Sequence, residues 1–468
     1  MSYQITKNIP KEIFRAYDVR GIVDESFTEN NIYTVGVAIG SEALSLGVKT
    51  LAVGRDGRIS GPVLLEALIA GIRVTGCNVI NLGEVTTPIV YYKAALIDSR
   101  SGVVLSGSHN PPNYNGIKMV LNGETLYGNA IQRLYQRIVD RNYQFSNGML
   151  VNEEVIGNYI QRIVSDVKLA RPLKVVVDCG NGVGGKIAPN LIRRLGCEVH
   201  ELFCDVDGNF PNHHPDPSEP KNLEDLVSQT QKLDADIGLA FDGDADRVGV
   251  VTNTGEIIVA DRILMLFALD LLTRRPGETI IFDVKCSRNL INQIRKHGGI
   301  PLMYKTGHSL VKAKMKECGV LLAGEMSGHI FFKERWYGFD DGIYVAARLL
   351  ELIARKTDSC DDIFAALPNS IITPEIKIFL SEDRKFNFME EFKQKASFPS
   401  GRINLIDGVR VDYDHGFGLV RPSNTSPNLI MRFEGDTEND LLNIQNAFRE
   451  ELLKIDANLD LSDLLGSY

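Results

Sequence analysis

The stretch Ile237–Arg247, IGLAFDGDADR, joins a short apolar run to an acidic loop and gives the first indication of the fold. Two other stretches repeat this design: GVVLSGSHNPP at 102–112 and GVLLAGEMSGH at 319–329. Each apolar run has the length of a buried strand, and a polar loop follows its carboxyl end. Ligands of α/β proteins bind beyond the carboxyl ends of strands. We therefore expect the three loops to contribute to one composite active site.

The order strand, polar turn, helix, strand recurs three times. The copies begin with TLAVG at 50–54, LKVVVD at 173–178 and TIIFD at 279–283. Ser60 and Ser287 are suitable N-terminal caps for the helices of the first and third copies. Such self-similarity is typical of duplicated α/β units. The strand pattern by itself favours a purely parallel sheet in each copy.

The pattern changes after about residue 368. Residues 403–413 alternate around an Asp-Gly turn, as an antiparallel hairpin would. Residues 429–433 read as another strand, and 440–455 as an amphipathic helix, so this part is a smaller α+β domain. We predict four domains: 1–152 with the serine loop, 153–256 with the acidic loop, 257–368 with the GEMSGH loop, and 369–468.

Composition excludes several classes of protein. The 468 residues are 44% hydrophobic and 24% charged, as in an ordinary globular protein. With 60 acidic and 51 basic residues the net charge is −9, which argues against a nucleic-acid partner. Seven cysteines without a CxxC pair indicate reduced thiols and a cytoplasmic protein. The most apolar helix candidate, 263–272, is too short to span a membrane.

The serine loop offers a nucleophile. Gly107 allows a tight turn before Ser108, while His109 and Lys118 supply positive charge or move protons. Ser106 is a second hydroxyl in the same loop, and composition does not choose between the two serines. The alternative interpretation is a surface turn without catalytic function.

The acidic loop is the stronger signal. On a locally extended chain, the carboxylates of Asp242, Asp244 and Asp246 would point to one side. Three hard oxygen ligands suit Mg²⁺ or Ca²⁺. Arg247 comes next and is suited to a phosphate. A solvated acidic turn is the alternative, but the preceding apolar run predicts burial, and buried carboxylates need a cation.

The remaining candidates are suited to a sugar phosphate. Carboxylate and hydroxyl groups bind vicinal sugar hydroxyls, and arginine with hydroxyl and amide groups binds phosphate. The candidates are Glu325, Ser327 and His329 in the third loop, Lys285, Thr306, Gly307 and His308 in the same repeat, Arg421, Ser423, Asn424 and Thr425 in the last domain, and Tyr17 and Arg20 near the N-terminus.

Four motifs together make the chain resemble the α-D-phosphohexomutase family over nearly its whole length. They are SGSHNPP, DGDADR, GEMSGH and RPSNTSP, in this order. The GEMSGH form and the run NYNGIK at 113–118 are most similar to the bacterial phosphomannomutase/phosphoglucomutase branch of that family.

The resemblance implies an α/β fold in which three similar domains with mixed sheets and a C-terminal α+β domain surround a central cleft. It implies a phosphorylated Ser108 beside Mg²⁺ held by the three aspartates and by Ser108 itself. It assigns the sugar to Glu325 and Ser327 with Lys285 and His308, and the distal phosphate to the loop from Arg421 to Thr425, with Tyr17 nearby. Proton transfer falls to Arg20, Lys118 or the histidines.

The implied reaction is reversible phosphoryl transfer between the 1- and 6-positions of mannose and glucose phosphates, through a phosphoserine enzyme and a hexose 1,6-bisphosphate. We expect a monomeric enzyme that binds small hexose phosphates, with no nucleic-acid or membrane partner. The alternatives are a phosphoglucosamine mutase, a metal-dependent sugar-phosphate phosphatase, or a sugar-phosphate sensor without activity. The sequence does not rank mannose against glucose.

Overall fold

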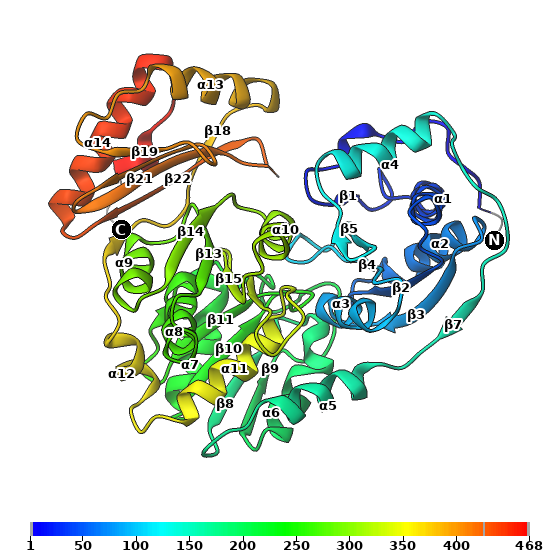
Figure 1. Cartoon of the computed structure of the whole chain (residues 1–468), viewed down its shortest axis with the longest axis horizontal. Coiled ribbons are helices and arrows are strands. Elements are labelled where there is room, and N and C mark those ends of the chain that lie inside the picture. The colour runs from blue at the N-terminus through cyan, green and yellow to red at the C-terminus, as the bar shows by residue number, and fades with distance from the viewer. Residues whose placement is uncertain (1–2, 425, 466–468) are drawn as a thin grey trace. The chain divides into compact units, whose positions relative to one another are not determined.

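The structure is a computed structural model that describes residues 3–424 and 426–465, with the side chains of Glu382 and Leu465 left out. The described chain separates into two compact units. Unit 1 comprises the chain up to Ala260, Lys312–Leu322 and Ser327–Phe364. Unit 2 comprises Asp261–Val311, Ala323–Met326 and the chain from Ala365 onward. The elements are labelled in Figure 1.

The first sheet of unit 1 has the strand order β1-β5-β4-β2-β3-β7, with β6 paired to β5. Parallel pairs join β4, β2, β3 and β7, whereas β5 runs antiparallel to β1, β4 and β6. The strand bounds are Val19–Ile22 (β1), Thr50–Arg55 (β2), Asn78–Glu84 (β3), Gly102–Leu105 (β4), Tyr114–Leu121 (β5), Glu124–Thr125 (β6) and Leu150–Asn152 (β7). Its helices are Glu29–Ser45 (α1), Gly61–Arg73 (α2), Thr87–Leu96 (α3) and Asn129–Val139 (α4).

The second sheet of unit 1 has the order β12-β11-β10-β8-β9. Strands β9, β8 and β10 pair in parallel, and β11 and β12 are added antiparallel. The bounds are Lys174–Asp178 (β8), Glu198–Leu202 (β9), Ile237–Phe241 (β10), Val248–Thr252 (β11) and Ile257–Ile258 (β12). The helices are Ile156–Asp166 (α5), Ala188–Arg194 (α6) and Glu224–Lys232 (α7). The 3₁₀ turns of the whole described chain are Lys11–Ile13, Val183–Lys186, Pro220–Leu223 and Ser462–Leu465.

A third sheet has the order β14-β13-β15-β16, and β13 and β14 pair in parallel. Its strands are Thr279–Asp283 (β13), Ile300–Tyr304 (β14), Leu322–Gly324 (β15) and Ile330–Phe332 (β16). The helices of this part are Ala260–Arg274 (α8), Arg288–Lys296 (α9), His308–Cys318 (α10), Gly342–Ala354 (α11) and Cys360–Ala365 (α12).

The C-terminal sheet is antiparallel in all its pairings: β17-β22-β21-β20-β19, with β18 also on β22. Helices α13 (Glu382–Lys395) and α14 (Glu438–Ile455) lie together on one face of this sheet (Figure 1). The strands are Ile371–Ile372 (β17), Ile376–Phe379 (β18), Arg402–Asn404 (β19), Val409–Tyr413 (β20), Gly416–Pro422 (β21) and Asn428–Gly435 (β22). The predicted hairpin around Asp407-Gly408 is confirmed as β19–β20.

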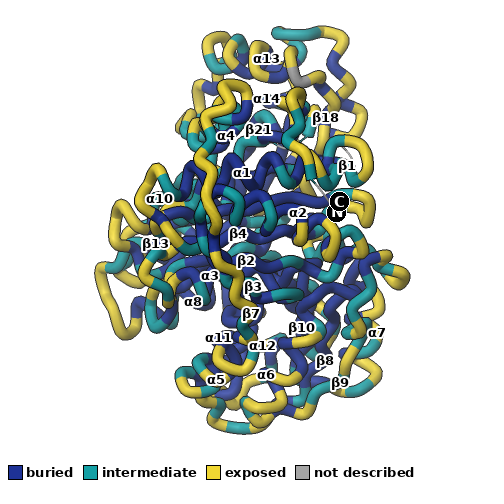
Figure 2. The backbone as a smooth tube through the Cα atoms, turned by 90° about the vertical axis from the view of Figure 1, so that its right-hand side faces the viewer, coloured by how far each residue is buried: buried dark blue, intermediate teal, exposed yellow. Residues whose placement is uncertain are grey.

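Burial follows the layered design. The central strands β2, β4, β8 and β10 are buried over nearly their whole length, whereas the edge strand β7 is exposed at every residue (Figure 2). Strands buried on both faces are typical of sheets covered by helices on two sides. The candidate loops therefore follow strands that cannot shift without disturbing a core.

Two sequence expectations need correction. The repeats are mixed rather than purely parallel, as the family resemblance implied, because a strand returns antiparallel after each of the first two loops. The third apolar run, 319–323, forms a strand only from Leu322, because Gly319 has φ of 69° and ends α10 in the left-handed conformation. The three predicted boundaries between the four domains stay a prediction.

Ser60 precedes α2 as predicted, but its hydroxyl accepts a hydrogen bond from Asn115 Nδ2 at 3.0 Å and does not cap the helix. Ser287 does cap α9, because its hydroxyl accepts the Asn289 N–H at 3.0 Å. Among the described residues, no helix has both the length and the apolar character needed to cross a membrane.

We expect Gly319→Ala to destabilise the fold by about 1–2 kcal/mol, because an L-residue is strained at its φ of 69° although no atom lies within 4 Å of the added Cβ. Gly157→Ala is the matched control, since Gly157 is an exposed helical residue of α5 and the same change there should stabilise by about 0.5–1 kcal/mol. Urea unfolding followed by circular dichroism measures both. Equal shifts for the two variants would contradict the backbone assignment.

Candidate active site

Three aspartates without any exposed surface lie in the turn after β10: Asp242, Asp244 and Asp246. The prediction of a locally extended chain is wrong, because Ala245 has φ of 57° and donates its N–H to the Asp242 carbonyl at 3.0 Å. This turn nevertheless gathers the carboxylates, and one oxygen from each lies within 4.8 Å of the others. The predicted cluster therefore forms, by a different backbone route.

A buried lysine balances two of these carboxylates. Lys118 Nζ donates to Asp244 Oδ2 at 2.7 Å and to Asp246 Oδ2 at 2.6 Å. Burial disfavours the ammonium, but both aspartates together raise the pKa of Lys118 well above its usual value. Burial likewise opposes ionisation of Asp244, yet Lys118 lowers the pKa of that carboxyl. Lys118 is therefore a fixed cation at neutral pH.

The cluster still lacks positive charge. Asp244 Oδ1 and Asp246 Oδ1 are buried and accept no hydrogen bond from any described residue. Burial, followed by the neighbouring Asp246 carboxylate, raises the pKa of Asp242 to about 8. Orphaned carboxylate oxygens and a carboxyl that resists ionisation are both relieved by a hard cation. The residues present therefore fit Mg²⁺, as predicted.

Ser108 faces this cluster. Its hydroxyl donates to Asp242 Oδ2 at 3.0 Å and lies 3.3 Å from His109 Nδ1. Burial, reinforced by Arg247, lowers the pKa of His109 well below its usual value, so the imidazole is neutral. A buried hydroxyl between a carboxylate and a neutral imidazole has acceptors for its proton on both sides.

Ser106 has different surroundings. Its buried hydroxyl lies 2.9 Å from both Asp56 Oδ2 and Asp244 Oδ2, and it accepts the Ser108 N–H at 2.9 Å. This hydroxyl is therefore held within the loop by three neighbours. The structure therefore distinguishes the two serines, which composition did not. Of the two hydroxyls, the one that donates to Asp242 belongs to Ser108.

Arg247 joins the aspartates to a further carboxylate. Its Nε donates to Asp242 Oδ2 and its Nη1 to Asp216 Oδ1, both at 3.1 Å, and Nη1 also reaches the Ser327 carbonyl at 3.4 Å. Burial opposes its charge, but Asp216 and Asp242 raise its pKa above the usual value. Because its Nη2 donates to no described residue, Arg247 keeps a buried cationic edge that suits an anionic group.

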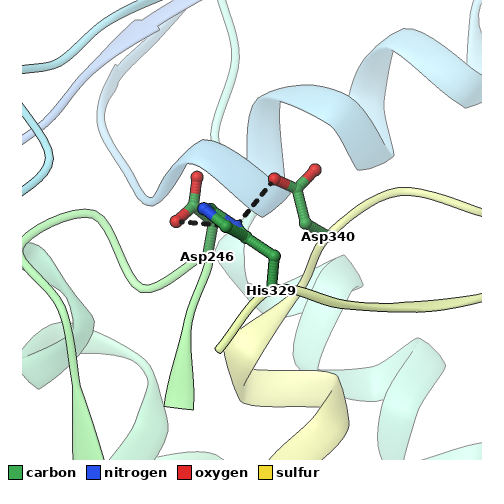
Figure 3. A group of neighbouring side chains, drawn as sticks. All are labelled: Asp246, His329 and Asp340. Atoms are coloured by element: carbon green, nitrogen blue, oxygen red, sulfur yellow. Dashed lines mark ion pairs between the residues drawn. The ribbon is translucent and has the colours of Figure 1, made fainter. Parts of the chain in front are cut away.

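His329 lies between two carboxylates, as Figure 3 shows. Its Nδ1 is 3.2 Å from Asp340 Oδ2 and 3.6 Å from Asp246 Oδ1. Lys312 Nζ in turn donates to Asp340 Oδ1 at 2.8 Å and lies 4.3 Å from the centre of the Tyr91 ring. The ring nitrogen next to two carboxylates is placed to carry a proton, and it borders the aspartate cluster directly.

The two candidates near the N-terminus also lie in unit 1. Arg20 is on β1, where it pairs with Gly116 of β5, and its Nη2 donates to Asp18 Oδ2 at 2.5 Å. Tyr17 is half-buried just before β1. Arg20 thus lies on the strand next to the one that carries Lys118.

A second group of candidates gathers in unit 2. Asp407 Oδ2 accepts the Thr306 N–H and Arg421 Nε, both at 3.0 Å, so one carboxylate connects two predicted binding loops. Gly307 N–H donates to Glu325 Oε1 at 2.5 Å. Lys285, which is buried, donates to Glu375 Oε1 at 2.5 Å and lowers the pKa of Glu375 to about 2.

The other candidates of unit 2 follow the same elements. His308 begins α10, while Ser423 and Asn424 come directly after β21. The Ser423 hydroxyl accepts the Ser426 N–H at 3.1 Å, which forms the turn of this loop. Thr425 lies outside the described residues.

Sequence reasoning missed several partners of the site: Asp56, Thr87, Asp216, Lys312 and Asp340. Thr87 donates its hydroxyl to Asp244 Oδ2 at 2.5 Å from the start of α3. The run HHPDP at 213–217 is an unusual polar loop that could have drawn attention to Asp216. Thr87 and Asp340 carry no comparable signal, because Thr87 meets Asp244 across 157 residues and Asp340 meets Lys312 across 28 residues.

The chain matches four family models in succession. They describe phosphoglucomutase/phosphomannomutase: alpha/beta/alpha domain I at residues 11–144, domain II at 157–255, domain III at 260–371 and the C-terminal domain at 375–451. The matches together cover most of the chain.

Curated relatives align over nearly their whole length. The phosphomannomutase/phosphoglucomutase of Pseudomonas putida is 54% identical over 461 residues, which is 98% of this chain and 100% of that protein. The phosphoglucomutase of Neisseria gonorrhoeae is 51% identical over 446 residues, 94% and 97% of the two chains. A crystal structure of a phosphoglucomutase/phosphomannomutase family protein from Burkholderia thailandensis has a TM-score of 0.93 at 48% identity, covering 97% and 99%.

We expect Mg²⁺ binding to weaken as the pH falls. The pKa of Asp242 is raised to about 8, so below that value a proton competes with the cation for the carboxylate. The apparent affinity should fall about tenfold per pH unit between about pH 8 and pH 6. Calorimetric titration with Mg²⁺ measures it. Asp242→Asn should bind Mg²⁺ more weakly and lose this pH dependence, and a wild-type affinity independent of pH would contradict the assignment.

Proposed function

Because the chain belongs to the phosphoglucomutase/phosphomannomutase family, we propose that it is a hexose-phosphate mutase, an isomerase that moves a phosphoryl group between the 1- and 6-positions of mannose and glucose phosphates. The observation that supports this best is Ser108, whose hydroxyl lies 3.0 Å from one of three buried carboxylates. A serine nucleophile beside a cation-binding cluster is what phosphoryl transfer to and from an enzyme requires.

The proposed reaction proceeds in two transfers. In the first, a hydroxyl oxygen of the hexose phosphate bonds to phosphorus, the bond from phosphorus to Ser108 Oγ breaks, and the hydroxyl proton passes to a base. In the second, Ser108 Oγ bonds to the other phosphorus of the resulting hexose 1,6-bisphosphate, the bond from that phosphorus to the sugar oxygen breaks, and the base returns a proton to the sugar oxygen. The bisphosphate also serves as the activator that phosphorylates an empty enzyme. Asp242, Asp244 and Asp246, together with Ser108, would hold Mg²⁺, which would neutralise charge on the phosphoryl group.

The basic residues of the site have different proposed roles. Lys118 keeps its proton because two aspartates hold it, so it is a counter-charge rather than a base. Arg247, whose Nη2 donates to no described residue, would bind the transferring group through that edge. His329, between Asp246 and Asp340, is the residue we assign to proton transfer with the sugar hydroxyl, and His109 serves the Ser108 hydroxyl. Arg20 adds positive charge.

A second set of residues is suited to the sugar and its other phosphate. Glu325, with Ser327 and the segment from Thr306 to His308, would bind sugar hydroxyls, and Lys285 would add a cation. Arg421, Ser423, Asn424 and Thr425, with Tyr17, would bind the phosphate that is not reacting. We also propose that the enzyme is a cytoplasmic monomer. Its seven free cysteines fit a reducing compartment.

The test of this proposal is an assay of the purified protein with Mg²⁺ and a trace of glucose 1,6-bisphosphate. Mannose, glucose and glucosamine 1-phosphates are offered in turn, and both the 6-phosphate product and inorganic phosphate are measured. Isomerisation of the mannose and glucose phosphates supports the proposal. Release of inorganic phosphate without isomerisation would indicate a phosphatase, and preference for the glucosamine phosphate would indicate a phosphoglucosamine mutase.

Ser108→Ala should abolish formation of the phosphoenzyme and leave the fold intact, because it removes the hydroxyl that faces Asp242. Ser106→Ala is the matched control in the same loop, and its phosphoenzyme should still form. Incubation with glucose 1,6-bisphosphate followed by phosphopeptide mapping measures both variants. A label on Ser106 in the wild-type protein would overturn the choice of nucleophile.

Arg421→Ala should raise KM for the 1-phosphate and the 6-phosphate alike by about 10–100-fold, the loss of one to two charge-assisted hydrogen bonds. Both isomers are affected because each must place its non-reacting phosphate in the same loop. Arg402→Ala, which removes an exposed arginine on β19, should leave both constants unchanged. A defect confined to one isomer would argue against a single phosphate-binding loop.

A further inference from the structure

Arg58 lies buried beneath the loop that carries Ser108, with 1% of its surface exposed. Its Nη1 donates to the carbonyls of Pro111 at 2.5 Å and Tyr114 at 3.0 Å. Its Nη2 donates to the carbonyls of Ser108 at 2.8 Å and Asn110 at 2.6 Å. One guanidinium therefore holds four carbonyls of the serine loop.

The fifth N–H of Arg58 and its charge are also satisfied. Nε donates to Asp56 Oδ2 at 3.2 Å, and the Phe210 ring lies over the guanidinium with its centre 5.2 Å away. A guanidinium has five N–H groups, and all five have acceptors within the protein. Arg58 thus has no donor left for a substrate phosphate, which distinguishes it from Arg247.

Asp56 completes the support from the other side of the loop. It is 2% exposed, and its Oδ2 accepts the Gly107 N–H at 3.0 Å and the Ser106 hydroxyl at 2.9 Å. The pair Asp56–Arg58 therefore binds N–H, hydroxyl and carbonyl groups of one short loop. Neither side chain contacts the Ser108 hydroxyl itself.

The conformation of the loop explains why such support is needed. Ser108 has φ of 49°, a left-handed conformation that L-residues disfavour. A Cβ added at Gly107 would lie 2.2 Å from Arg58 Nε, so the loop is packed directly on the guanidinium. Strained backbone persists only where the surroundings fix it.

We propose that Arg58, seated on Asp56 and Phe210, is the positioning residue that holds Ser108 with its hydroxyl against Asp242. This inference rests on the proposed function, in which Ser108 carries the phosphoryl group. Arg58 acts on the backbone of the nucleophile and leaves substrate binding untouched. Loss of Arg58 should therefore lower kcat and leave KM for hexose phosphate nearly unchanged.

The decisive variant is Arg58→Lys, which keeps the charge but replaces five fixed donors by three on a single nitrogen. An ammonium cannot reach all four carbonyls at once, so the Ser108 hydroxyl should move away from Asp242. We expect kcat to fall about 100-fold, the size of effect that small misplacement of a reacting group produces. The rate of Ser108 phosphorylation by glucose 1,6-bisphosphate, followed by intact mass, should fall in parallel.

Arg348→Lys is the matched control. Arg348 is also buried in unit 1, donates to Glu334 Oε2 at 2.9 Å and lies 4.6 Å from the centre of the Phe332 ring, but it contacts nothing in the serine loop. Its replacement should lower the melting temperature and leave kcat unchanged. Any loss of kcat common to both variants reflects general destabilisation and argues against a special role for Arg58.

The outcomes separate the two hypotheses. Wild-type protein without mutase activity and without label on Ser108 would refute the proposed function. Active wild-type protein with a folded Arg58→Lys variant whose kcat is unchanged, or whose loss is in KM, would overturn the positioning role. If Arg58→Lys does not fold, Phe210→Leu decides, because it removes only the ring over the guanidinium: a lower kcat at constant KM supports the role, and an unchanged kcat overturns it.

Discussion

The site depends on neutralising three carboxylates that have no contact with water. Asp242, Asp244 and Asp246 are fully buried, and charges in such surroundings persist only with close partners of opposite sign. Lys118 and Arg247 supply two positive charges, and the oxygens they leave unbonded fit a divalent cation. The arrangement ties metal binding, the ionisation of Asp242 and the placement of Ser108 to one another, since Asp242 contacts both Ser108 and Arg247.

The antiparallel strands of the two mixed sheets follow the serine loop and the aspartate loop, and they position the cations that neutralise the carboxylates. Strand β5 returns antiparallel beside β4, and this pairing sets Lys118 opposite Val104, next to the loop that carries Ser108. Strand β11 returns antiparallel from the aspartate loop and pairs Val248 with Phe241, so Arg247 is held directly against the carboxylates. A purely parallel sheet would have carried the chain away into a helix after each loop. The antiparallel strands β5 and β11 therefore place Lys118 and Arg247 next to the aspartates.

Hydrogen bonds to backbone groups hold several loops of the candidate site in place. Four carbonyls of the serine loop converge on Arg58, and the turn of the aspartate loop relies on left-handed Ala245. In unit 2, Asp407 similarly joins the N–H of Thr306 to the guanidinium of Arg421. Arg58 and Asp407 each bind a loop from outside it, so the loops can be polar and still well defined.

The sequence by itself determined the repeated strand-loop units, the antiparallel C-terminal hairpin and the aspartate cluster, and it favoured a cation there. These follow from local patterns: apolar runs, turn residues and carboxylates at fixed spacing. It also placed Gly319 in a strand where the structure ends a helix, because a glycine that permits positive φ looks the same in either role. Errors of this kind shift the end of one helix or the start of one strand.

Only the tertiary structure distinguishes the surroundings of the two serines, because Ser108 meets Asp242 and Ser106 meets Asp244, each more than a hundred residues away in the chain. Only the tertiary structure showed Thr87, Asp340 and Arg58 at the site. Their contacts form between segments distant in the chain, and no local pattern records which carbonyl or carboxylate a buried side chain will meet after folding.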